Sequence, residues 1–454
     1  MTAAQRLPPG PRAPEIAQTL NWLLHPVRFM ERSRERYGEL FTIKIRSSGP
    51  WVFVCDPEHI KQVFTGKSKD VHTGEANAVL RPVLGGSSTL TLDEDEHLRR
   101  RKLVLPQFHG ERMQRYGEAM DHVAHREMQS WPVGEPFTLW PHMRAMTLEV
   151  ITRTVFGVEE TERMRHMSKL LGDMLDGVTN SRFLGRLMFV GPDRVERSKG
   201  LAAKLAPVHE AVLDEIARRR TAPDLAERED ILSMLVQARY EDGSPMSDAE
   251  LLSELKTLLV AGHDTTTTEL SWAFERLLRH PEKLERVREE ALTGESDYVD
   301  AVVKETLRQR PVFPIAMRKL TKPMEIGGYE LPAGMAVRPC IYLMHYNEDI
   351  YPEAERFLPE RFLERPPGTY TWIPFGGGMR RCIGASFALF EMRKVLQAVV
   401  TEFDLRPADD RPEQIVRRSI TMAPEKDTEV IATRRRKAAS AGSAPGQASL
   451  ATPA

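Results

Sequence analysis

Cysteine is scarce in this sequence, because its 454 residues include only Cys55, Cys340 and Cys382. An odd set of three widely spaced cysteines forms no disulfide framework, which favours a reducing compartment. A lone cysteine is most often a buried small side chain, and we interpret Cys55 and Cys340 in this way. No apolar run approaches the ~18 residues of a membrane-spanning helix, and the N-terminus lacks the apolar core of a signal peptide. We therefore expect a cytoplasmic protein without a transmembrane anchor.

Net charge is also nearly absent, because 64 Lys and Arg residues face 65 Asp and Glu residues, which leaves −1. This balance excludes a strongly basic nucleic-acid-binding protein, and an apolar share of 41% excludes a disordered chain. A chain of this length can bury roughly three quarters of its unfolded surface without covalent cross-links. No internal repeat and no linker divides the sequence, so we expect one large core.

Helical patterns dominate the chain. The longest and most apolar one covers 247–279, where Ser247 and Glu250 have the spacing of a capping box. A charged, amphipathic pattern predicts a helix over 195–220, and another helix is expected over 297–308. The predicted fold class is therefore mainly α.

Strand patterns are few and short, and they cover 40–45, 51–54, 324–326, 335–338 and 430–431. We predict a single mainly α domain with a small β region over 20–437. A proline-rich N-terminal segment over 1–19, extended at 8–14, would precede it. Residues 438–454 carry no charge and little bulk, which predicts a disordered tail.

The third cysteine lies in an unusual loop. Residues 374–385 read PFGGGMRRCIGA, so glycines surround Cys382 and would let a bulky group approach the backbone. A strongly helical segment follows, and the positive end of a helix dipole favours a thiolate, as do the charges of Arg380 and Arg381. Haem iron accepts a single cysteine as axial ligand, whereas a zinc site would need about three more ligands at short spacing. The loop therefore favours a haem thiolate.

The pattern F-x-x-G-x-R-x-C-x-G, formed here by Phe375, Gly378, Arg380, Cys382 and Gly384, resembles the haem-binding loop of the cytochrome P-450 superfamily. The resemblance extends over about 20–433, with the family's motifs in the family's order. It implies the mainly α cytochrome P-450 fold with a minor β region. It also implies haem b with Cys382 as the axial metal ligand.

A second motif supports this resemblance. Glu305-Thr306-Leu307-Arg308 matches the family's E-x-x-R motif, and its two charged groups lie three residues apart on one helix face. The later FLPERF segment at 357–362 resembles the family's P-x-R-F element. The resemblance implies a buried, structural network of Glu305, Arg308 and Arg361 that holds the loop carrying Cys382. An isolated E-x-x-R would instead be read as a solvated surface pair.

The long apolar helix contains a third motif. Its sequence AGHDTT at 261–266 resembles the family's oxygen-activation motif. Threonines at 265–268 are poor helix formers, and their hydroxyls can compete for backbone carbonyls and bend the helix. A mildly destabilised helix turn is the alternative. The resemblance implies a widened turn that admits dioxygen and water, with Ala261 against the cofactor, Thr265 hydrogen-bonding the oxygen and Asp264 relaying protons.

The resemblance also assigns contacts to the cofactor. His97 and Arg101 form an H-x-x-x-R pattern on one helix face, where both could reach haem propionates. Arg318 and Arg380 are propionate partners by their positions relative to the family. Cofactor contacts are likewise implied for three loop residues, Phe375, Gly376 and Gly384. One departure from the family is the HYNED sequence at 345–349, which we expect to change local packing without affecting the chemistry.

The implied activity is monooxygenation: O₂ is activated with NAD(P)H-derived electrons, and the substrate is hydroxylated or epoxidised. No flavin or ferredoxin segment follows, so we expect electrons to come from a separate ferredoxin or flavodoxin and its reductase. The protein itself is expected to be a monomer. A basic docking surface for that partner is expected from Arg99, Arg100, Lys102, Arg112, Arg115, Arg381, Arg393 and Lys394. Ordinary solubilising charge is the alternative interpretation of this group.

The substrate is expected to be lipophilic, such as a fatty acid, terpenoid, steroid or macrolide. By family position it would contact segments 72–92, 171–190, 260–261, 312–317 and 419–421, which are rich in apolar side chains. Three other haem-thiolate functions remain open at this point. A peroxygenase, or an isomerase or dehydratase, often lacks the Asp264–Thr265 pair, and a non-catalytic binding protein would not need it.

Overall fold

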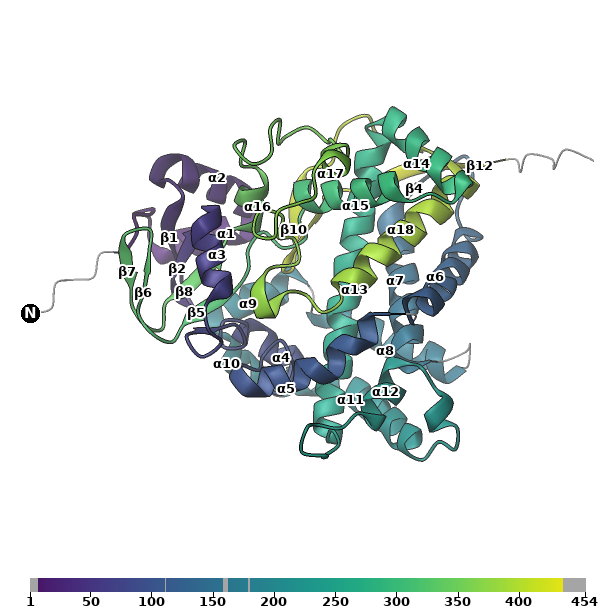
Figure 1. Cartoon of the computed structure of the whole chain (residues 1–454), viewed down its shortest axis with the longest axis horizontal. Helices are drawn as coiled ribbons and strands as arrows, with labels where there is room; N and C mark the ends of the chain where they lie inside the picture. The colour runs from purple at the N-terminus through teal and green to yellow at the C-terminus, as the bar shows by residue number, and fades with distance from the viewer. Residues whose placement is uncertain (1–6, 111, 158–161, 179, 436–454) are drawn as a thin grey trace, which may run out of the picture.

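The computed structural model describes residues 7–435 except 111, 158–161 and 179. Figure 1 shows a strand-rich part on the left, formed by β1, β2 and β5–β8 with the first three helices, and a larger helical part on the right. The described chain is therefore mainly α, as predicted. The predicted tail over 438–454 lies outside the described residues.

The proline-rich segment runs along the strand-rich part. Its Pro9 carbonyl accepts a hydrogen bond from the Thr42 N–H at 2.9 Å, and the Pro8 carbonyl accepts one from the Thr42 hydroxyl at 2.8 Å. A Cβ added to Gly10 would lie 1.9 Å from the Thr42 carbonyl oxygen, so only glycine permits this contact. The first helix begins at Glu15, so the second part of the 1–19 segment already contains regular structure.

The main sheet has five strands in the order β1-β2-β8-β5-β3. Its strands are β1 (Leu40–Ile45), β2 (Gly49–Val54), β3 (Val71–His72), β5 (Arg318–Leu320) and β8 (Ala336–Pro339). β2 and β8 pair in parallel and the other neighbours pair antiparallel. The predictions for β1, β2 and β8 are confirmed within two residues. Strands β3 and β5 were not predicted, because two or three residues carry no alternating pattern.

Three smaller β units complete the strand inventory of the described residues. One has the order β4-β12-β9, and the others are the β6–β7 and β10–β11 hairpins. Their bounds are β4 (Pro136–Thr138), β6 (Met324–Ile326), β7 (Tyr329–Leu331), β9 (Phe403–Pro407), β10 (Ile415–Arg418), β11 (Thr421–Pro424) and β12 (Glu429–Arg434). The predicted strands at 324–326 and 430–431 correspond to β6 and part of β12.

Helices supply most of the fold. In the first half they are α1 (Glu15–Leu24), α2 (Pro26–Tyr37), α3 (Pro57–Thr65), α4 (Arg81–Leu84), α5 (Glu94–Val104), α6 (Arg112–Met128), α7 (Leu139–Phe156), α8 (Glu162–Val178), α9 (Ser181–Val190), α10 (Pro192–Glu196) and α11 (Lys199–Arg220). In the second half they are α12 (Ile231–Gln237), α13 (Asp248–Leu278), α14 (Pro281–Thr293), α15 (Asp297–Gln309), α16 (Ile341–His345), α17 (Arg361–Glu364) and α18 (Ala385–Glu402). The predicted helix at 195–220 is wrong as one element, because the chain leaves the helix at Arg197 and re-enters it after Ser198.

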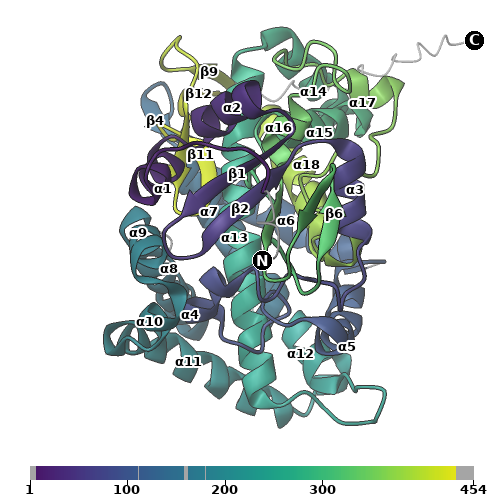
Figure 2. The ribbon, with the colours of Figure 1, turned by 90° about the vertical axis from the view of Figure 1, so that its left-hand side faces the viewer.

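The 31-residue helix α13 is the central element of the helical part. It passes through the middle of the molecule in two perpendicular views (Figures 1 and 2). It packs against α7, α11, α15 and α18. The predicted capping box is confirmed, since the Ser247 side chain accepts from the Glu250 N–H and Glu250 accepts from the Ser247 N–H. None of the described helices is long and apolar enough to cross a membrane.

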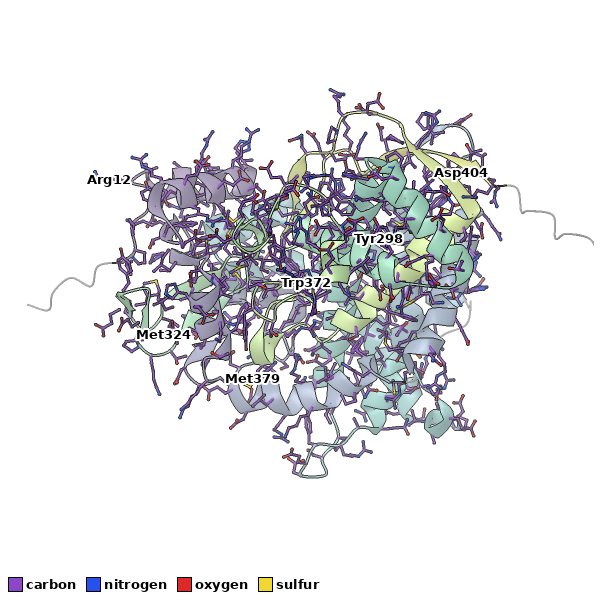
Figure 3. The ribbon with its side chains drawn as sticks, turned by 45° about the horizontal axis from the view of Figure 1, so that its top comes forward. Arg12, Tyr298, Met324, Trp372, Met379 and Asp404 are labelled. Atoms are coloured by element: carbon purple, nitrogen blue, oxygen red, sulfur yellow. The ribbon has the colours of Figure 1, made fainter. Side chains whose placement is uncertain are left out.

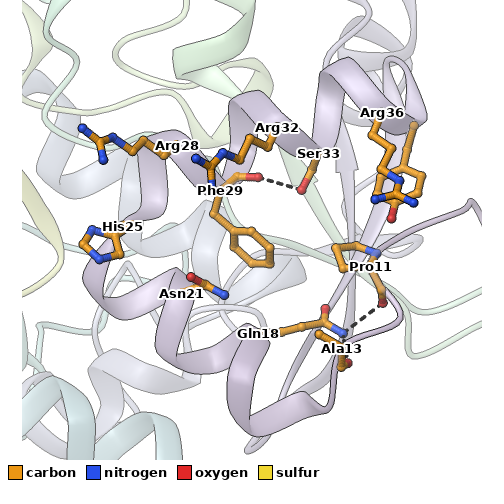
Figure 4. A pocket seen from close by; sticks show the side chains of 11 residues that line it. Pro11, Ala13, Gln18, Asn21, His25, Arg28, Phe29, Arg32, Ser33 and Arg36 are labelled. Atoms are coloured by element: carbon orange, nitrogen blue, oxygen red, sulfur yellow. Dashed lines mark hydrogen bonds between the residues drawn. The ribbon is translucent and has the colours of Figure 1, made fainter.

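A surface pocket of about 310 Å³ lies between the N-terminal segment, α1 and α2 (Figure 4). Phe29 lies between the two helices there, and Arg28, Arg32 and Arg36 line one side. No residue assigned above to catalysis or cofactor contact lines this pocket. It is therefore separate from the candidate functional site.

Candidate functional site

The cysteine loop ends directly at a helix. Cys382 lies three residues before α18, whose N-cap is Gly384. The Cys382 N–H donates to the Phe375 carbonyl at 3.0 Å, which closes the loop. Figure 3 labels Trp372, two residues before this loop, in the middle of the view, and Met379 of the loop below it. The sequence prediction that Cys382 precedes a helix N-terminus is confirmed.

Cys382 is exposed, as are Gly378, Met379 and Arg381 of the same loop. Desolvation raises the pKa of the Cys382 thiol, whereas the Gly384 N–H and the charges of Arg381 and Arg101 lower it. The Gly384 N–H and the two arginines therefore favour the thiolate, and desolvation opposes it. The other two cysteines are buried, as interpreted from the sequence.

The loop glycines serve two different purposes. A Cβ added to Gly377 would lie 2.3 Å from the Phe64 ring, and one added to Gly378 would lie 2.1 Å from the Phe64 carbonyl oxygen. These two glycines therefore accommodate α3, which corrects the expectation that every glycine clears space for a cofactor. Gly376, at φ +67°, and Gly384 have open space where a Cβ would point. Only these two leave room for a large group beside Cys382.

Three cationic arginines and the neutral imidazole of His97 gather beside the loop. Burial lowers the pKa of His97 to about 3, and the charges of Arg380, Arg101 and Arg318 act in the same direction. Burial also lowers the pKa of Arg318 to about 9, with Arg380 adding to the effect and Asp93 opposing it. The three guanidinium groups and the imidazole thus lie within electrostatic reach of one another. We call these four residues the cation cluster.

Among the described residues, Asp93 is the one carboxylate that pairs with the cation cluster. Arg380 donates to Asp93 and to the Leu92 carbonyl, each at 2.6 Å. Asp93 already accepts from the N–H groups of Thr73 and Gly74. The side chains of His97 and Arg101 form no hydrogen bond with any described residue. The site has an excess of positive charge, and the two propionates of a haem are anions of the right number and kind to balance it.

The fit to haem rests on this donor set. Cys382 offers one thiolate, the cation cluster offers partners for carboxylates, and two glycines leave space between them. Within the described ranges, no three His, Cys, Asp or Glu side chains lie close enough together to hold a metal ion. A single cysteine ligand is what a haem iron requires from this side. The residues present therefore fit the group that the sequence resemblance implies.

Helix α13 presents the acid–alcohol pair. Ala261 is exposed in the middle of this largely buried helix, and Asp264 and Thr265 are half-buried. The Thr265 hydroxyl donates to the Ala261 carbonyl at 2.7 Å, and the next three threonines make the same bond four residues back. The helix is continuous over Asp248–Leu278 in spite of these bonds, and the expected local widening stays a prediction. The apolar flanks of the cysteine loop, Phe375 and Ile383, pack against the same core as this helix.

A buried polar group supports Asp264. His263 Nε2 lies 3.5 Å from Asp264 Oδ1, and His263 Nδ1 lies 2.9 Å from the Thr147 hydroxyl of α7. Thr147 also contacts the Thr267 hydroxyl at 2.7 Å. Burial lowers the pKa of His263 to about 3, so this ring is neutral at physiological pH. Sequence reasoning missed this group because its partner comes from a helix more than a hundred residues away.

The expected structural network is present. Arg308 Nε and Nη2 donate to the two Glu305 oxygens at 2.7 and 2.9 Å, and both side chains are fully buried. Arg361 Nε donates to Glu305 at 3.3 Å. The remaining Arg308 donors reach the carbonyls of His345 and Ala354, both at 2.7 Å. α15 is thereby fixed to the segments that precede the cysteine loop.

His345 completes this connection, and sequence reasoning did not identify it. Its Nδ1–H donates to the Arg308 carbonyl at 3.1 Å, and its Nε2 accepts from the Ile373 N–H at 3.0 Å. Ile373 lies two residues before Phe375, so the imidazole joins the E-x-x-R helix to the start of the cysteine loop. The HYNED departure noted above begins at this residue.

The comparison with known families shows to which protein family this chain belongs. The cytochrome P-450 family profile matches residues 8–431. The chain belongs to the cytochrome P-450 family. It is similar to cytochrome P-450 135B1 of Mycobacterium tuberculosis, with 39% identity over 98% of this chain and 96% of that protein. It is also similar to cytochrome P-450 137 of the same organism, with 38% identity over 93% and 90% of the two chains.

The fold of this P-450 is shared with a solved structure. The retinoic acid-bound structure of cyanobacterial CYP120A1 superimposes with a TM-score of 0.82 at 24% identity, over 95% of this chain and 100% of that chain. The prediction of a mainly α P-450 fold in one domain is confirmed. This protein is accordingly a cytochrome P-450 monooxygenase, a class that uses haem and redox partners.

The expected basic docking surface of this P-450 is largely neutralised. Arg100 does not belong to the surface, because it is 4% exposed and pairs with Glu250 and Glu254. Ion pairs join Arg99 to Asp242, Lys102 to Glu241, Arg115 to Glu229, Arg393 to Asp300 and Lys394 to Asp121. Among the described residues, only Arg112 and Arg381 of the eight have no ion pair. Sequence reasoning could not see these partners, because most come from distant elements.

Acid should weaken this P-450 through His345. Burial, with a contribution from Arg308, lowers the folded-state pKa of His345 to about 3, against about 6.5 in the unfolded chain. The unfolded state then binds the extra proton between these values, so stability falls as pH decreases below about 6.5. The expected slope is about 1.4 kcal/mol per pH unit for this group. Urea unfolding at pH 7, 6 and 5 measures this slope in wild type and in His345→Gln. The slope of the variant should be smaller by the contribution of about one proton.

The control for this measurement is His109→Gln, which changes an exposed histidine. It should keep the wild-type slope. An unchanged slope in His345→Gln would show that burial does not hold this ring neutral.

Proposed function

We propose that this P-450 holds haem b through the Cys382 thiolate and oxidises a lipophilic small molecule by hydroxylation or epoxidation. The electrons would come from a separate ferredoxin or flavodoxin and its reductase. The observation that supports this most directly is the exposed thiol at the start of α18, within electrostatic reach of Arg101 of the cation cluster. When bound, the haem supplies reductive activation of O₂.

The chain's own residues would hold and orient the cofactor. Cys382 would provide the axial ligand, with the Gly384 N–H stabilising its negative charge. His97, Arg101, Arg318 and Arg380 would bind the propionates, whose two charges would balance the positive charge that Asp93 leaves. Phe375, Gly376 and Gly384 on one side, and Ala261 on the other, would lie against the ring.

Thr265 and Asp264 would manage protons. The Thr265 hydroxyl already donates its hydrogen to the Ala261 carbonyl, so its oxygen is available to accept a hydrogen bond from a water or from protonated oxygen. Asp264 is half-buried beside a neutral His263, which suits a carboxylate that alternately gains and loses a proton. Both side chains lie within one helical turn of the exposed Ala261.

The lipophilic substrate is proposed from the lining segments. The partly exposed side chains Phe313 and Met317 lie on the segment before β5, and Phe183 lies on α9. Such a lining suits a fatty acid, terpenoid, steroid or macrolide skeleton better than a sugar or nucleotide.

Thr265→Ala should uncouple the enzyme. Haem and substrate binding should persist, but more NADPH should appear as H₂O₂ and less as oxidised product, because proton delivery is no longer steered. General acid catalysis contributes about 10²–10⁴-fold, so the loss should exceed assay noise. The measurement is product formed per NADPH consumed, with a surrogate ferredoxin and reductase. Asp264→Asn should chiefly slow turnover and raise the solvent isotope effect.

Thr266→Ala is the matched control, because Thr266 makes the same backward hydrogen bond but is buried. It should keep the wild-type coupling. If Thr265→Ala and Asp264→Asn also kept wild-type coupling and rate, the pair would be no more than a helix turn.

A further inference from the structure

Arg417 of β10 is a buried cation without an anion. Its Nε and Nη2 atoms are buried and have no hydrogen-bond partner, and it pairs with no carboxylate among the described residues. Its guanidinium carbon lies 4.7 Å from the centre of the Trp22 ring, which is its one described polar or aromatic interaction. Burial lowers the pKa of Arg417 to about 10, so it remains charged at neutral pH. Leaving such donors unpaired is costly, and natural proteins rarely do so without a reason.

The two unpaired nitrogens form one edge of the guanidinium. Arg308 uses the same two atoms, Nε and Nη2, to hold both oxygens of Glu305. That edge matches a carboxylate in a bidentate geometry, which is the strongest hydrogen-bonded pairing of an arginine. Arg417 therefore presents a carboxylate-binding edge for which this chain supplies no carboxylate.

The surroundings of Arg417 are apolar. It lies over an aromatic and aliphatic cluster that includes Trp22 of α1, Leu184 and Met188 of α9, and Ile415 of its own strand. The residue as a whole is half-buried and its two unpaired nitrogens are covered, so a ligand reaches them only when the side chain shifts. Because the neighbouring side chains are apolar, an anion that carries an apolar body matches this environment better than a bare inorganic anion does.

The hairpin that carries Arg417 borders the expected substrate segments. Arg417 lies directly across the hairpin from Met422. The Met422 N–H donates to the Val312 carbonyl, and the Met422 carbonyl accepts from the Trp272 indole of α13, both at 2.9 Å. β11 is thus fixed between the long helix and the 312–317 segment. α9, which contacts the same apolar cluster as Arg417, belongs to the 171–190 segment.

The next residue, Arg418, has different surroundings from Arg417. Arg418 lies on the other face of the hairpin, where it pairs with Asp427 and stacks over the Trp140 ring at 4.2 Å. Arg418 thus has a carboxylate partner within the protein, whereas Arg417 has none among the described residues.

We propose that Arg417 binds the carboxylate of the substrate, so that the substrate of this P-450 is an amphipathic lipid carboxylic acid. The carboxylate occupies the Nε–Nη2 edge, after a small shift of the side chain away from Trp22, and the apolar body extends past α9 and Val312 toward Ala261. This inference rests on the proposed function, because it names the substrate class of the same site.

The test compares acids with neutral partners of the same shape. Haem-loaded wild type, Arg417→Met, Arg417→Lys and Arg418→Met are titrated with decanoic, tetradecanoic and octadecanoic acids, an isoprenoid acid, and the primary amide of each. The readout is the dissociation constant from the spectral change on displacement of the iron-bound water. Wild type should bind at least one acid about tenfold or more tighter than its amide, as expected for hydrogen bonds to a charged group.

Arg417→Met should reduce this acid preference to about one, because a similar volume remains without the charge. Arg417→Lys should keep part of it, and Arg418→Met should keep all of it. Equal binding of every acid and its amide by wild type would overturn the inference, as would an acid preference that survives in Arg417→Met. A normal thiolate-type ferrous–carbon monoxide spectrum in these proteins separates that failure from failure of the proposed function, which would abolish the spectrum in wild type too.

Discussion

Replacing Cys382 by alanine is expected to abolish the thiolate-type ferrous–carbon monoxide spectrum and all monooxygenase activity. No other cysteine can substitute, because Cys55 and Cys340 are fully buried in the cluster around Trp22 and Phe53. The loop itself should persist, since its closure uses the backbone N–H of Cys382 and not its sulfur. Far-ultraviolet circular dichroism should therefore resemble that of wild type, while the spectrum and turnover are lost.

The matched controls are Cys55→Ala and Cys340→Ala. Each removes one buried sulfur and should cost some stability through a small cavity, but the carbon monoxide spectrum should stay normal. A normal spectrum in Cys382→Ala would refute the assignment of the axial ligand and, with it, the proposed function.

Glu305→Ala is expected to yield little haem-loaded protein. The change leaves the fully buried Arg308 guanidinium without a carboxylate and its Nε without a partner, and breaking such a pair costs about 3–5 kcal/mol. It also removes the acceptor of the Leu358 N–H and of Arg361. Arg308→Lys should fail almost as badly, because one ammonium cannot serve Glu305 and two separate carbonyls in this geometry. The measurement is the ratio of haem absorbance to protein in purified material.

Arg356→Ala provides the control for this network. Arg356 pairs with Glu353 three residues earlier in the same connecting region, but both side chains are exposed. Exposed pairs contribute roughly 0–1 kcal/mol, so haem loading should match wild type. Well-loaded, fully active Glu305→Ala enzyme would contradict a structural role for the buried network.

Features that depend on residues close together in the chain could be predicted from the sequence. The capping box of α13, the helix after Cys382 and the i, i+3 spacing of Glu305 and Arg308 each depend on residues within one helical turn of each other. The Glu305–Arg361 contact was inferred only because the motifs resembled a family. Burial of Cys55 and Cys340 followed from the usual behaviour of lone cysteines.

Features that depend on distant partners could not be predicted. The imidazole of His345 joins Arg308, 37 residues earlier in the chain, to Ile373, 28 residues later. Gly377 and Gly378 are small because of Phe64, which lies more than three hundred residues earlier. The charge of Arg100 is absorbed by carboxylates of α13 and not by solvent. In each case the sequence shows the residue type but not the neighbour that explains it.

The cation cluster also bears on how the protein is assembled. Like charges at one place oppose the final closure of the chain, and a porphyrin bound as proposed would bring two carboxylates that remove this opposition. A ligand that binds the folded chain and not the unfolded chain shifts the folding equilibrium toward the folded form by mass action. Under the proposed function, cofactor uptake and the last step of folding would be one coupled equilibrium. The amount of folded enzyme in a cell would then depend on the supply of haem as well as on the polypeptide.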